Sequence, residues 1–340
     1  MSDIEPTDRI LATAQEAVID GVRYVNLTDQ PLEALPSQLP DGLTPIKVVF
    51  LPDFSPGPRD AIPTGVCVEL DPRVNPEWRR LLTYDVGCGI QMVESNVSYD
   101  TFMDQPEKWD AVADEMRSRD GGPGDIGSGN HFLDAVIDPT GRGGVRFVIH
   151  TGTPRKDDLR GQLIEAAHQR DGEQFERVYQ ALLRGAVENR AAVVEILKKQ
   201  YGPLVHINDT THNTYRRTDG GNIRVYKGAV PINPGELNLI PSSMDGDMIL
   251  VRATDKVSTT LNAISHGTGR VVPRSLTSSE THIDFATLRR RLMIPTSISD
   301  ASIRGERPTH YRDITDFRRL IGDHIEEVER YTPIAYIGQI

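Results

Sequence analysis

Cysteine, long apolar runs and basic residues are all scarce in this chain. Cys67 and Cys88 are the only cysteines among 340 residues, too few for a disulfide framework. In a reducing compartment, a lone cysteine near His and Asp is better explained as a metal ligand or a nucleophile. The apolar runs are too short to span a membrane, and the acidic start MSDIEPTDRI lacks the features of a secretory signal. We therefore expect a cytoplasmic protein without a membrane segment.

The shortage of basic residues gives a net charge of −11, which argues against non-specific nucleic-acid binding, because phosphate affinity depends on clustered Lys and Arg. Basic residues nevertheless gather in four places: Arg155, Lys156 and Arg160; Arg216 and Arg217; Arg270 and Arg274; and Arg289 to Arg291. The last group fits a solvated helix face. The other three each stand beside a histidine motif, where a phosphate-facing role and a solvated surface are equally consistent with the sequence.

Short β-branched or alternating runs, bounded by Pro, Gly and Asp, predict strands at 46–53, 64–70, 89–95, 145–151, 222–228, 247–253 and 332–339. Apolar residues at three and four spacing predict helices within 156–200, 283–293 and 315–330. No Pro, Gly or Ser-rich linker separates two halves. The pattern therefore predicts one mixed α/β domain over residues 1–340, with a helical insertion at about 156–200.

A cysteine and an aspartate flank a tight turn in TYDVGCGI (83–90). The glycines allow the backbone to turn so that Asp85 and Cys88 face one point, and a thiolate with a carboxylate suits a divalent transition metal. Taken alone, the same segment is also consistent with a buried cysteine beside an aspartate that only forms the turn.

Histidines recur in similar small, polar surroundings near strands, in SGNHFLD (128–134), VIHTGTPR (148–155), THNTYRR (211–217) and AISHGTGR (263–270). Neutral imidazole is the commonest metal ligand. Each of His131, His150 and His212 singly fits a hydrogen-bonded loop histidine, but together with Cys88 they indicate a metal site. The small residues around them leave room for a substrate.

The strings DVGCG, GSGNHF, IHTGT, HN, KGA, PxSM and SHGxGR follow one another in this order. Together they resemble the RtcB RNA ligases, from about Leu51 to Tyr311. LPDFSPG (51–57) is similar to the family's P-D-x-H-x-G turn, and RPTHYRDI (307–314) to its late tyrosine motif. The resemblance implies a mixed α/β (α+β) fold, in which mixed sheets with flanking helices surround a deep, metal-lined pocket.

The resemblance also implies roles for individual residues. Two manganese ions would be held by a shared Cys88 thiolate and by Asp85, His131, His150 and His212, and His266 would be the nucleophile. Asn130 would contact phosphate oxygens, and Asp134, Ser243 and Tyr311 would hold the guanine. Arg155 and Arg270 are further candidate phosphate contacts.

The activity implied is the joining of RNA 3′-phosphate or 2′,3′-cyclic phosphate ends to 5′-hydroxyl ends, in RNA repair or tRNA splicing. His266 would attack the α-phosphate of GTP, and the GMP would activate the RNA 3′-phosphate. The resemblance further implies an activator protein as a partner. Manganese enters only through the family, because intrinsic affinity favours zinc, copper or nickel.

Three positions depart from the family pattern. The histidine of the P-D-x-H-x-G turn is Ser55, and the glutamate that reads the guanine edge is Asp134. The chain ends YIGQI, with Gly338 where family members carry a lysine that reaches the nucleotide. We therefore expect a divergent paralogue with slower guanylylation and looser selection of GTP over ATP.

Two alternatives remain open at this level. A metal-dependent RNA-end phosphodiesterase or phosphatase would keep the metal centre and hydrolyse RNA ends without nucleotide transfer. A non-catalytic RNA-end binder would catalyse neither hydrolysis nor ligation.

Overall fold

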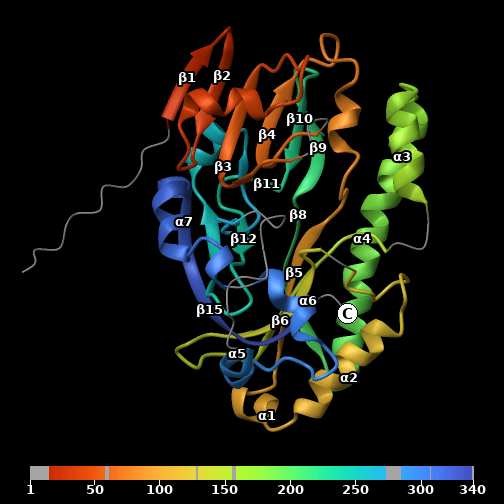
Figure 1. Ribbon diagram of the computed structural model, residues 1–340, viewed down its shortest axis with the longest axis vertical. Coiled ribbons are helices and arrows are strands. Elements are labelled where there is room, and N and C mark those ends of the chain that lie inside the picture. Colours follow the sequence, from red (N-terminus) through yellow and green to blue (C-terminus); the bar gives the residue numbers. More distant parts are fainter. Residues whose placement is uncertain are drawn as a thin grey trace, which may run out of the picture.

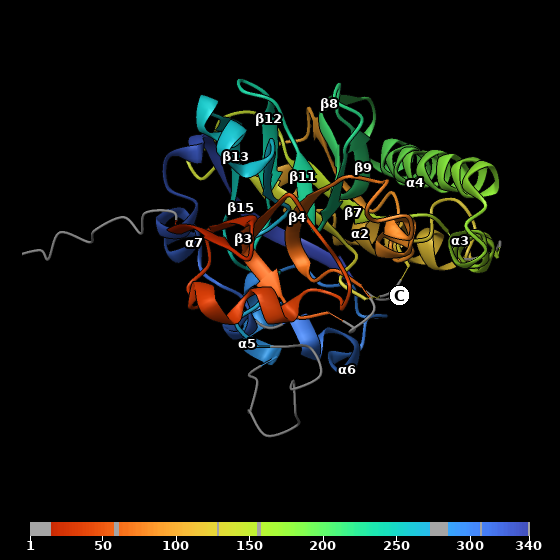
Figure 2. The same ribbon diagram turned by 90° about the horizontal axis from the view of Figure 1, so that it is seen from above.

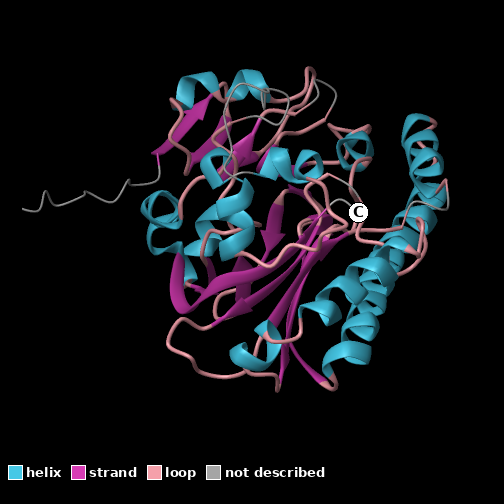
Figure 3. Ribbon diagram, turned by 60° about the horizontal axis from the view of Figure 1, so that its bottom comes forward, coloured by secondary structure: helices cyan, strands magenta, loops and turns pink. Residues whose placement is uncertain are grey.

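The chain has a mixed α/β fold of sheets with flanking helices, as the sequence predicts, but of its two large sheets only the first combines parallel and antiparallel pairs. The computed structural model describes residues 15–57, 61–127, 129–154, 158–272, 285–306 and 308–338. Strands occupy the centre, and helices lie around them (Figure 3). Seen from above, α3 and α4 lie on one side of the strands and α7 on the opposite side (Figure 2).

The first sheet has six strands, in the spatial order β1 (Gln15–Ile19), β2 (Val22–Asn26), β3 (Lys47–Ser55), β4 (Thr64–Leu70), β10 (Ile223–Lys227) and β9 (Asn213–Arg217). Only β2 and β3 pair in parallel; the other neighbours are antiparallel. The inner positions of β3 and β4 are almost all buried, as their β-branched runs require.

The second sheet has seven strands, in the order β12 (Leu237–Ile240), β13 (Met248–Ala253), β15 (Ile325–Gly338), β6 (Phe132–Ile137), β7 (Arg146–Thr151), β5 (Gly89–Ser95) and β8 (Leu204–Thr211). All of its neighbours are antiparallel. A separate pair, β11 (Ala229–Pro231) and β14 (Ala263–Ser265), carries the chain into the histidine motif at 266.

The helices are α1 (Tyr99–Met103), α2 (Pro106–Arg117), α3 (Leu159–His168), α4 (Gly172–Tyr201), α5 (Phe285–Arg291), α6 (Asp300–Ile303) and α7 (Ile314–Ile321). The helical segment predicted within 156–200 is thus confirmed as α3 and α4, which run along one side of the molecule (Figure 1). The single-domain assignment itself stays a prediction.

Helix α4 joins the two halves of the core. Its early apolar residues, such as Phe175 and Leu182, pack in one cluster with Val48 and Phe50 of the first sheet. Its later residues, such as Val193, pack with residues of the second sheet and of α2. No helix within the described parts of the chain is both long and apolar enough to cross a bilayer.

One predicted helix is partly wrong. Residues 315–330 form a helix only as far as Ile321, and strand β15 begins at Ile325. The helix ends because Gly322 has a φ of +58° and a ψ of −135°, a backbone conformation that glycine adopts readily and that cannot continue a helix. The charged stretch that follows is the partly exposed beginning of β15, so its acidic and basic residues face solvent from a strand.

Candidate metal centre and active site

Residues from both sheets line a cavity of about 920 Å³. Of the residues that the sequence predicts for the site, its wall includes Asp85, Cys88, Asn130, His131, Asp134, His150, His212, His266, Arg270 and Tyr311. Ser243 is not part of this wall, and its neighbour Ser242 is. Arg155, Lys156 and Arg274 lie outside the described residues.

The turn before β5 positions Cys88 at the base of the cavity. Asp85 and Gly87 have φ values of +54° and +79°, and the Cys88 amide donates to the Asp85 carbonyl at 3.0 Å. A Cβ at position 87 would lie 2.9 Å from Cβ of Ala186 in α4, so glycine is needed for both the backbone angle and the close approach. The resulting turn presents a thiol that is 3% exposed.

Three histidines surround this thiol. The Nε2 atoms of His131 and His150 each lie 3.3 Å from Sγ of Cys88, and Nε2 of His212 lies 3.4 Å from Nε2 of His150. The ligand atoms of Cys88, His150 and His212 are all within 4.8 Å of one another. His131 makes its other ring contact, through Nδ1, with the Ile126 carbonyl at 2.9 Å. The sequence prediction that these residues converge is therefore matched by their positions.

The protonation states of the cluster suit a cation. Burial, followed by the neighbouring histidines, holds the pKa of His150 and of His212 well below the usual value, so both rings are neutral and can donate a lone pair. Burial and then Asp85 raise the pKa of the Cys88 thiol to about 12. A divalent metal would displace that proton, and a soft sulfur with imidazole nitrogens suits transition metals.

Asp85 stands beside this cluster. Its carboxylate is 68% exposed and lies 3.1 Å from Nζ of Lys227, a lysine that is itself only 12% exposed. Lys227 also donates to the Tyr84 carbonyl at 3.2 Å. Its ammonium therefore lies at the wall of the cavity, next to the proposed ligands.

His266 follows β14 and is fixed through one ring nitrogen. Its Nδ1 lies 2.5 Å from Oδ2 of Asp53 and 2.9 Å from the Gly228 carbonyl. Both partners are acceptors, so in the neutral ring Nδ1 carries the proton and Nε2 keeps the lone pair. The His266 and His212 rings are 4.5 Å apart, centroid to centroid, which places the His266 ring beside the Cys88 cluster.

Two adjacent residues of α4 hold the ligand-bearing loops from behind. The Arg190 guanidinium, 1% exposed, lies 2.8 Å from Asp209 and donates to the carbonyls of Gly87 and Thr151 at 3.2 Å. Asn189 donates to the Gly152 carbonyl at 2.9 Å and accepts from the Gly124 amide. These contacts fix the residues next to Cys88 and His150.

Of the remaining predicted contacts, Asp134, Arg270 and Tyr311 line the cavity and Ser243 does not. Asp134 is 1% exposed, its Oδ1 has no partner among the described residues, and burial raises its pKa well above the usual value. Arg270 donates to the Tyr311 hydroxyl at 2.9 Å, to the Gly305 carbonyl at 2.7 Å and to Glu306 at 3.3 Å. Its Nη1 thus holds Tyr311 and Glu306, while Nη2 and Nε donate to the backbone carbonyls of Gly305 and Val272. The Ser243 hydroxyl is directed to Asp245 at 3.3 Å.

Two positions that depart from the family pattern also adjoin the cavity. Ser55 ends β3 and is part of the wall. Gly338 ends β15, and a Cβ there would lie 2.1 Å from the hydroxyl oxygen of Tyr336, which lines the cavity. The Tyr336 ring therefore lies in the space that a side chain at position 338 would enter.

Sequence reasoning missed Asp53, Asn189 and Arg190. Asp53 stands in the LPDFSPG segment that resembles a family turn, so its motif was visible although its role was not. Asn189 and Arg190 lie in an ordinary amphipathic helix. Their one signal in the sequence is that two adjacent polar residues, Asn189 and Arg190, fall on the face of the helix that its apolar residues predict to be buried.

Comparison with known proteins agrees with this arrangement. The family model described as tRNA-splicing ligase RtcB matches residues 162–339, a segment that contains His212 and His266. A search of curated proteins gave no match. The matched segment covers just over half of the chain, and the mixed fold and the Cys88 cluster are those expected for this family. The chain therefore belongs to the RtcB family of metal-dependent RNA ligases.

Proposed function

We propose that this protein joins RNA 3′-phosphate or 2′,3′-cyclic phosphate ends to 5′-hydroxyl ends through a GMP–histidine intermediate. The observation that carries the proposal is the orientation of His266. Asp53 and the Gly228 carbonyl occupy its Nδ1, which leaves Nε2 as the nucleophilic nitrogen beside the Cys88 cluster.

The donor set fits the metal that the family requires. The neutral rings of His131, His150 and His212 and the buried Cys88 thiol converge, with Asp85 on the same cavity wall. We propose that these five residues would hold two manganese ions and that the two ions would share the Cys88 thiolate. When bound, such ions would offset phosphate charge and polarise the reacting oxygens.

The first step forms the covalent intermediate. The Nε2 lone pair of His266 attacks the α-phosphorus of GTP, a P–N bond forms, the α–β P–O bond breaks, and pyrophosphate leaves. The Nδ1 proton stays in the hydrogen bond to Asp53, which stabilises the charge that develops on the ring. Lys227, and Arg160 on the same wall, are placed to offset charge on the phosphates.

The later steps transfer and then release GMP. A 2′,3′-cyclic phosphate end is first opened by water to a 3′-phosphate. An oxygen of the RNA 3′-phosphate attacks the GMP phosphorus, and the P–N bond to His266 breaks. The 5′-hydroxyl of the second RNA then attacks the activated 3′-phosphorus, a phosphodiester forms, and GMP leaves. Asn130 is proposed to contact these phosphates.

Guanine recognition is proposed for Asp134, Ser243 and Tyr311. Tyr311 and the buried Asp134 line the cavity, whereas Ser243 is not part of its wall. Arg270 fits a supporting role, because its donors hold Tyr311 and Glu306. A repair role with narrow RNA specificity, and an activator protein as partner, remain predictions from the family resemblance.

The decisive experiment measures the intact mass of the protein after incubation with manganese and GTP. The mass should rise by one GMP, the gain should be lost in acid and kept in base, and His266→Ala should show no gain. A gain that persists in His266→Ala would place the nucleophile elsewhere.

The hydrolase alternative rests on position 338, where the family resemblance implies a nucleotide-contacting lysine. This position is a glycine, and a Cβ there would lie 2.1 Å from the Tyr336 hydroxyl oxygen. A time course with RNA that ends in a 2′,3′-cyclic phosphate separates the two functions. Ligation predicts a joined product that requires GTP. Conversion to a monophosphate end without joining, with or without nucleotide, would support the hydrolase.

A further inference from the structure

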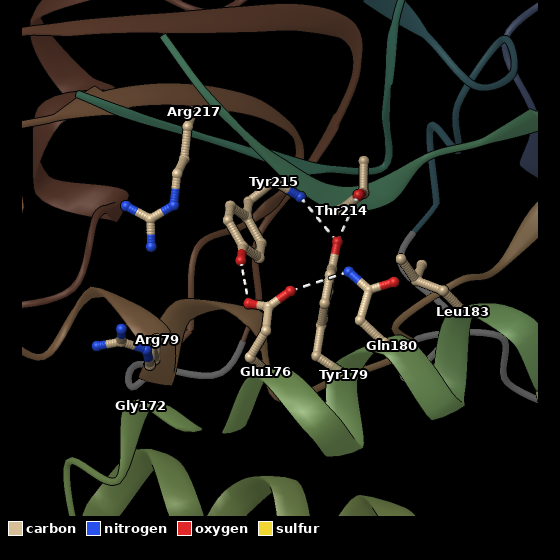
Figure 4. Close-up of a pocket in the computed structure, with 9 residues that line it drawn as sticks. All are labelled: Arg79, Gly172, Glu176, Tyr179, Gln180, Leu183, Thr214, Tyr215 and Arg217. Atoms are coloured by element: carbon tan, nitrogen blue, oxygen red, sulfur yellow. Dashed lines mark hydrogen bonds between the residues drawn. The ribbon is translucent and has the colours of Figure 1, made fainter. Parts of the chain in front are cut away.

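A second cavity, of about 560 Å³, lies outside the site described above, between α4, β9 and the 3₁₀ helix Trp78–Leu82 (Figure 4). Two arginines, Arg79 and Arg217, form part of its wall, together with Glu176 and Tyr215. Arg217 belongs to the basic pair that follows the histidine motif THNTYRR, and the catalytic steps leave this pair unused.

Arg79 is held in place without a carboxylate. Its guanidinium carbon lies 4.9 Å from the centroid of the Trp78 ring and 5.7 Å from that of Phe175. A Cβ on Gly172 would lie 2.9 Å from Nη2 of Arg79, so the guanidinium rests against the first residue of α4. Two positive features, a guanidinium and the N-terminal end of a 30-residue helix, thus face the same space.

Arg217 lies across the cavity from this pair of features (Figure 4). Neither Arg79 nor Arg217 has a carboxylate oxygen within 4.0 Å in the described part of the chain. Glu176 is the acidic residue of the wall, and it accepts hydrogen bonds from the Tyr215 hydroxyl and from the Gln180 amide at 2.9 Å. Asp171 caps α4 by accepting from the Gln174 amide. The two guanidiniums therefore keep their N–H donors for a ligand.

The cavity is next to the catalytic one. Leu182 and Asn213 line the catalytic cavity, and the residues that follow them, Leu183 and Thr214, line the second. At about 3.3 Å per strand residue, Arg217 lies roughly 13 Å along β9 from Asn213. A chain that leaves the catalytic cavity over this edge would reach the two arginines within a few nucleotides.

We propose that this cavity binds the phosphate backbone of the RNA strand whose end occupies the catalytic cavity. The inference rests on the proposed function, because it takes RNA as the substrate. Guanidinium groups bind phosphate oxygens through paired N–H donors. In a protein with a net charge of −11, such local cations must supply the affinity for a polyanion. Phosphate contacts do not read bases, so the site adds affinity without sequence preference.

The test compares two RNAs that end in the same 3′-phosphate, a dinucleotide and a 12-mer, by fluorescence anisotropy without GTP, so that no joining occurs. Wild-type protein should bind the 12-mer more tightly. Arg79→Gln with Arg217→Gln should weaken binding of the 12-mer by about tenfold and leave the dinucleotide affinity unchanged. The slope of log K against log salt should become shallower by about 1.4, at roughly 0.7 for each phosphate on a single strand.

Two further variants sharpen the result. Glu176→Gln keeps hydrogen-bonding atoms for Tyr215 and Gln180 and removes a negative charge from the wall, so it should tighten binding of the 12-mer. Arg23→Gln with Arg142→Gln makes the same change of net charge at two exposed positions outside both cavities, and should leave affinity and salt slope as in the wild type. Thermal unfolding of each variant establishes that it is folded.

Three results would overturn the proposal. Wild-type affinity and salt slope in Arg79→Gln with Arg217→Gln would show that the cavity holds no phosphate. Equal wild-type affinity for the two RNAs would show that no backbone lies outside the catalytic cavity, and an equal loss in the Arg23 and Arg142 control would show a general charge effect. The GMP adduct forms without RNA, so failure here is distinguishable from failure of the proposed ligase activity.

Discussion

Nδ1 of His266 lies 2.5 Å from Oδ2 of Asp53, a residue 213 positions earlier in the chain. The Asp53 side chain is fully buried, and its other oxygen has no partner among the described residues. A buried carboxylate is costly unless it is paired. Its pairing with the proposed nucleophile therefore indicates a positioning residue that fixes the ring and its tautomer.

Asp53→Asn tests this role. The amide can fill the same space but can present an N–H to Nδ1, which favours the wrong tautomer and removes the charge that stabilises a positive ring. By analogy with the aspartate of a catalytic triad, GMP adduct formation should slow by about 10²-fold to 10⁴-fold. Stopped reactions analysed by intact mass measure the rate.

The control for Asp53→Asn is its metal content and its unfolding temperature, both of which should stay near those of the wild type. A merely structural role would lower these and leave the adduct rate per folded molecule unchanged. That outcome would contradict the assignment of Asp53 as a positioning residue.

Cys88→Ala should lower the amount of bound metal and abolish activity. Its sulfur is the point on which His131 and His150 converge, so its loss should disturb both proposed ions. Metal analysis after gel filtration measures the change. Cys67→Ala is the matched control: Cys67 is buried within β4 and away from the cavity, so its metal content should not change. Full metal loading of Cys88→Ala would remove the shared-ligand assignment.

The sequence predicted local structure where the pattern was decisive. The strands at 64–70 and 89–95 match β4 and β5 residue for residue, because β-branched runs between turns have few alternatives. The stretch 325–330 was predicted as helix, because apolar residues continue at three and four spacing through 315–330. Pairing with β13 on one edge decides its conformation, and that partner is far away in the sequence.

The candidate site was predictable in its parts and not in its assembly. Cys88, His131, His150 and His212 could each be identified from small, polar surroundings, and the structure brings their side chains together. The hydrogen bond between Asp53 and His266 forms because β3 and β14 pack together in the fold. A local sequence pattern carries no information about such a contact between distant segments. The same holds for Arg190, whose partners are backbone carbonyls of two distant loops.

Arg190→Met should destabilise the protein and weaken metal binding. The substitution leaves Asp209 without its cation and two carbonyls without a donor, and breaking a buried pair costs about 3–5 kcal/mol. Metal affinity should fall because Gly87 and Thr151 adjoin the ligands Cys88 and His150. Denaturant unfolding and a metal titration measure the two effects.

A double-mutant cycle identifies the ion pair as the cause. Adding Asp209→Asn to Arg190→Met should recover part of the lost stability, because no unpaired carboxylate is left. Arg119→Gln removes a partly exposed pair with Glu115, which keeps Lys199 as a second cation, and should cost less than about 1 kcal/mol. Strictly additive losses in the cycle would mean that Arg190 acts through its backbone contacts alone.

The last prediction concerns the lysine that family members carry where this chain has Gly338. Restoring the lysine with Gly338→Lys should not raise the GMP adduct yield, because the new Cβ would lie 2.1 Å from the Tyr336 hydroxyl oxygen and 2.5 Å from its ring. Combining Gly338→Lys with Tyr336→Ala vacates that space. The ammonium could then approach the nucleotide, where one such contact contributes about 3 kcal/mol.

The yield of GMP adduct should therefore be higher in the double variant than in Tyr336→Ala alone, and selection of GTP over ATP should improve. Intact mass with each nucleotide measures both effects. If Gly338→Lys alone raised the yield as much, the Tyr336 ring would not be the obstacle. If strong wild-type guanylylation were unchanged in all three variants, the charge would already be supplied elsewhere. Lys227 is then the residue to test, because its ammonium lines the same cavity beside Asp85.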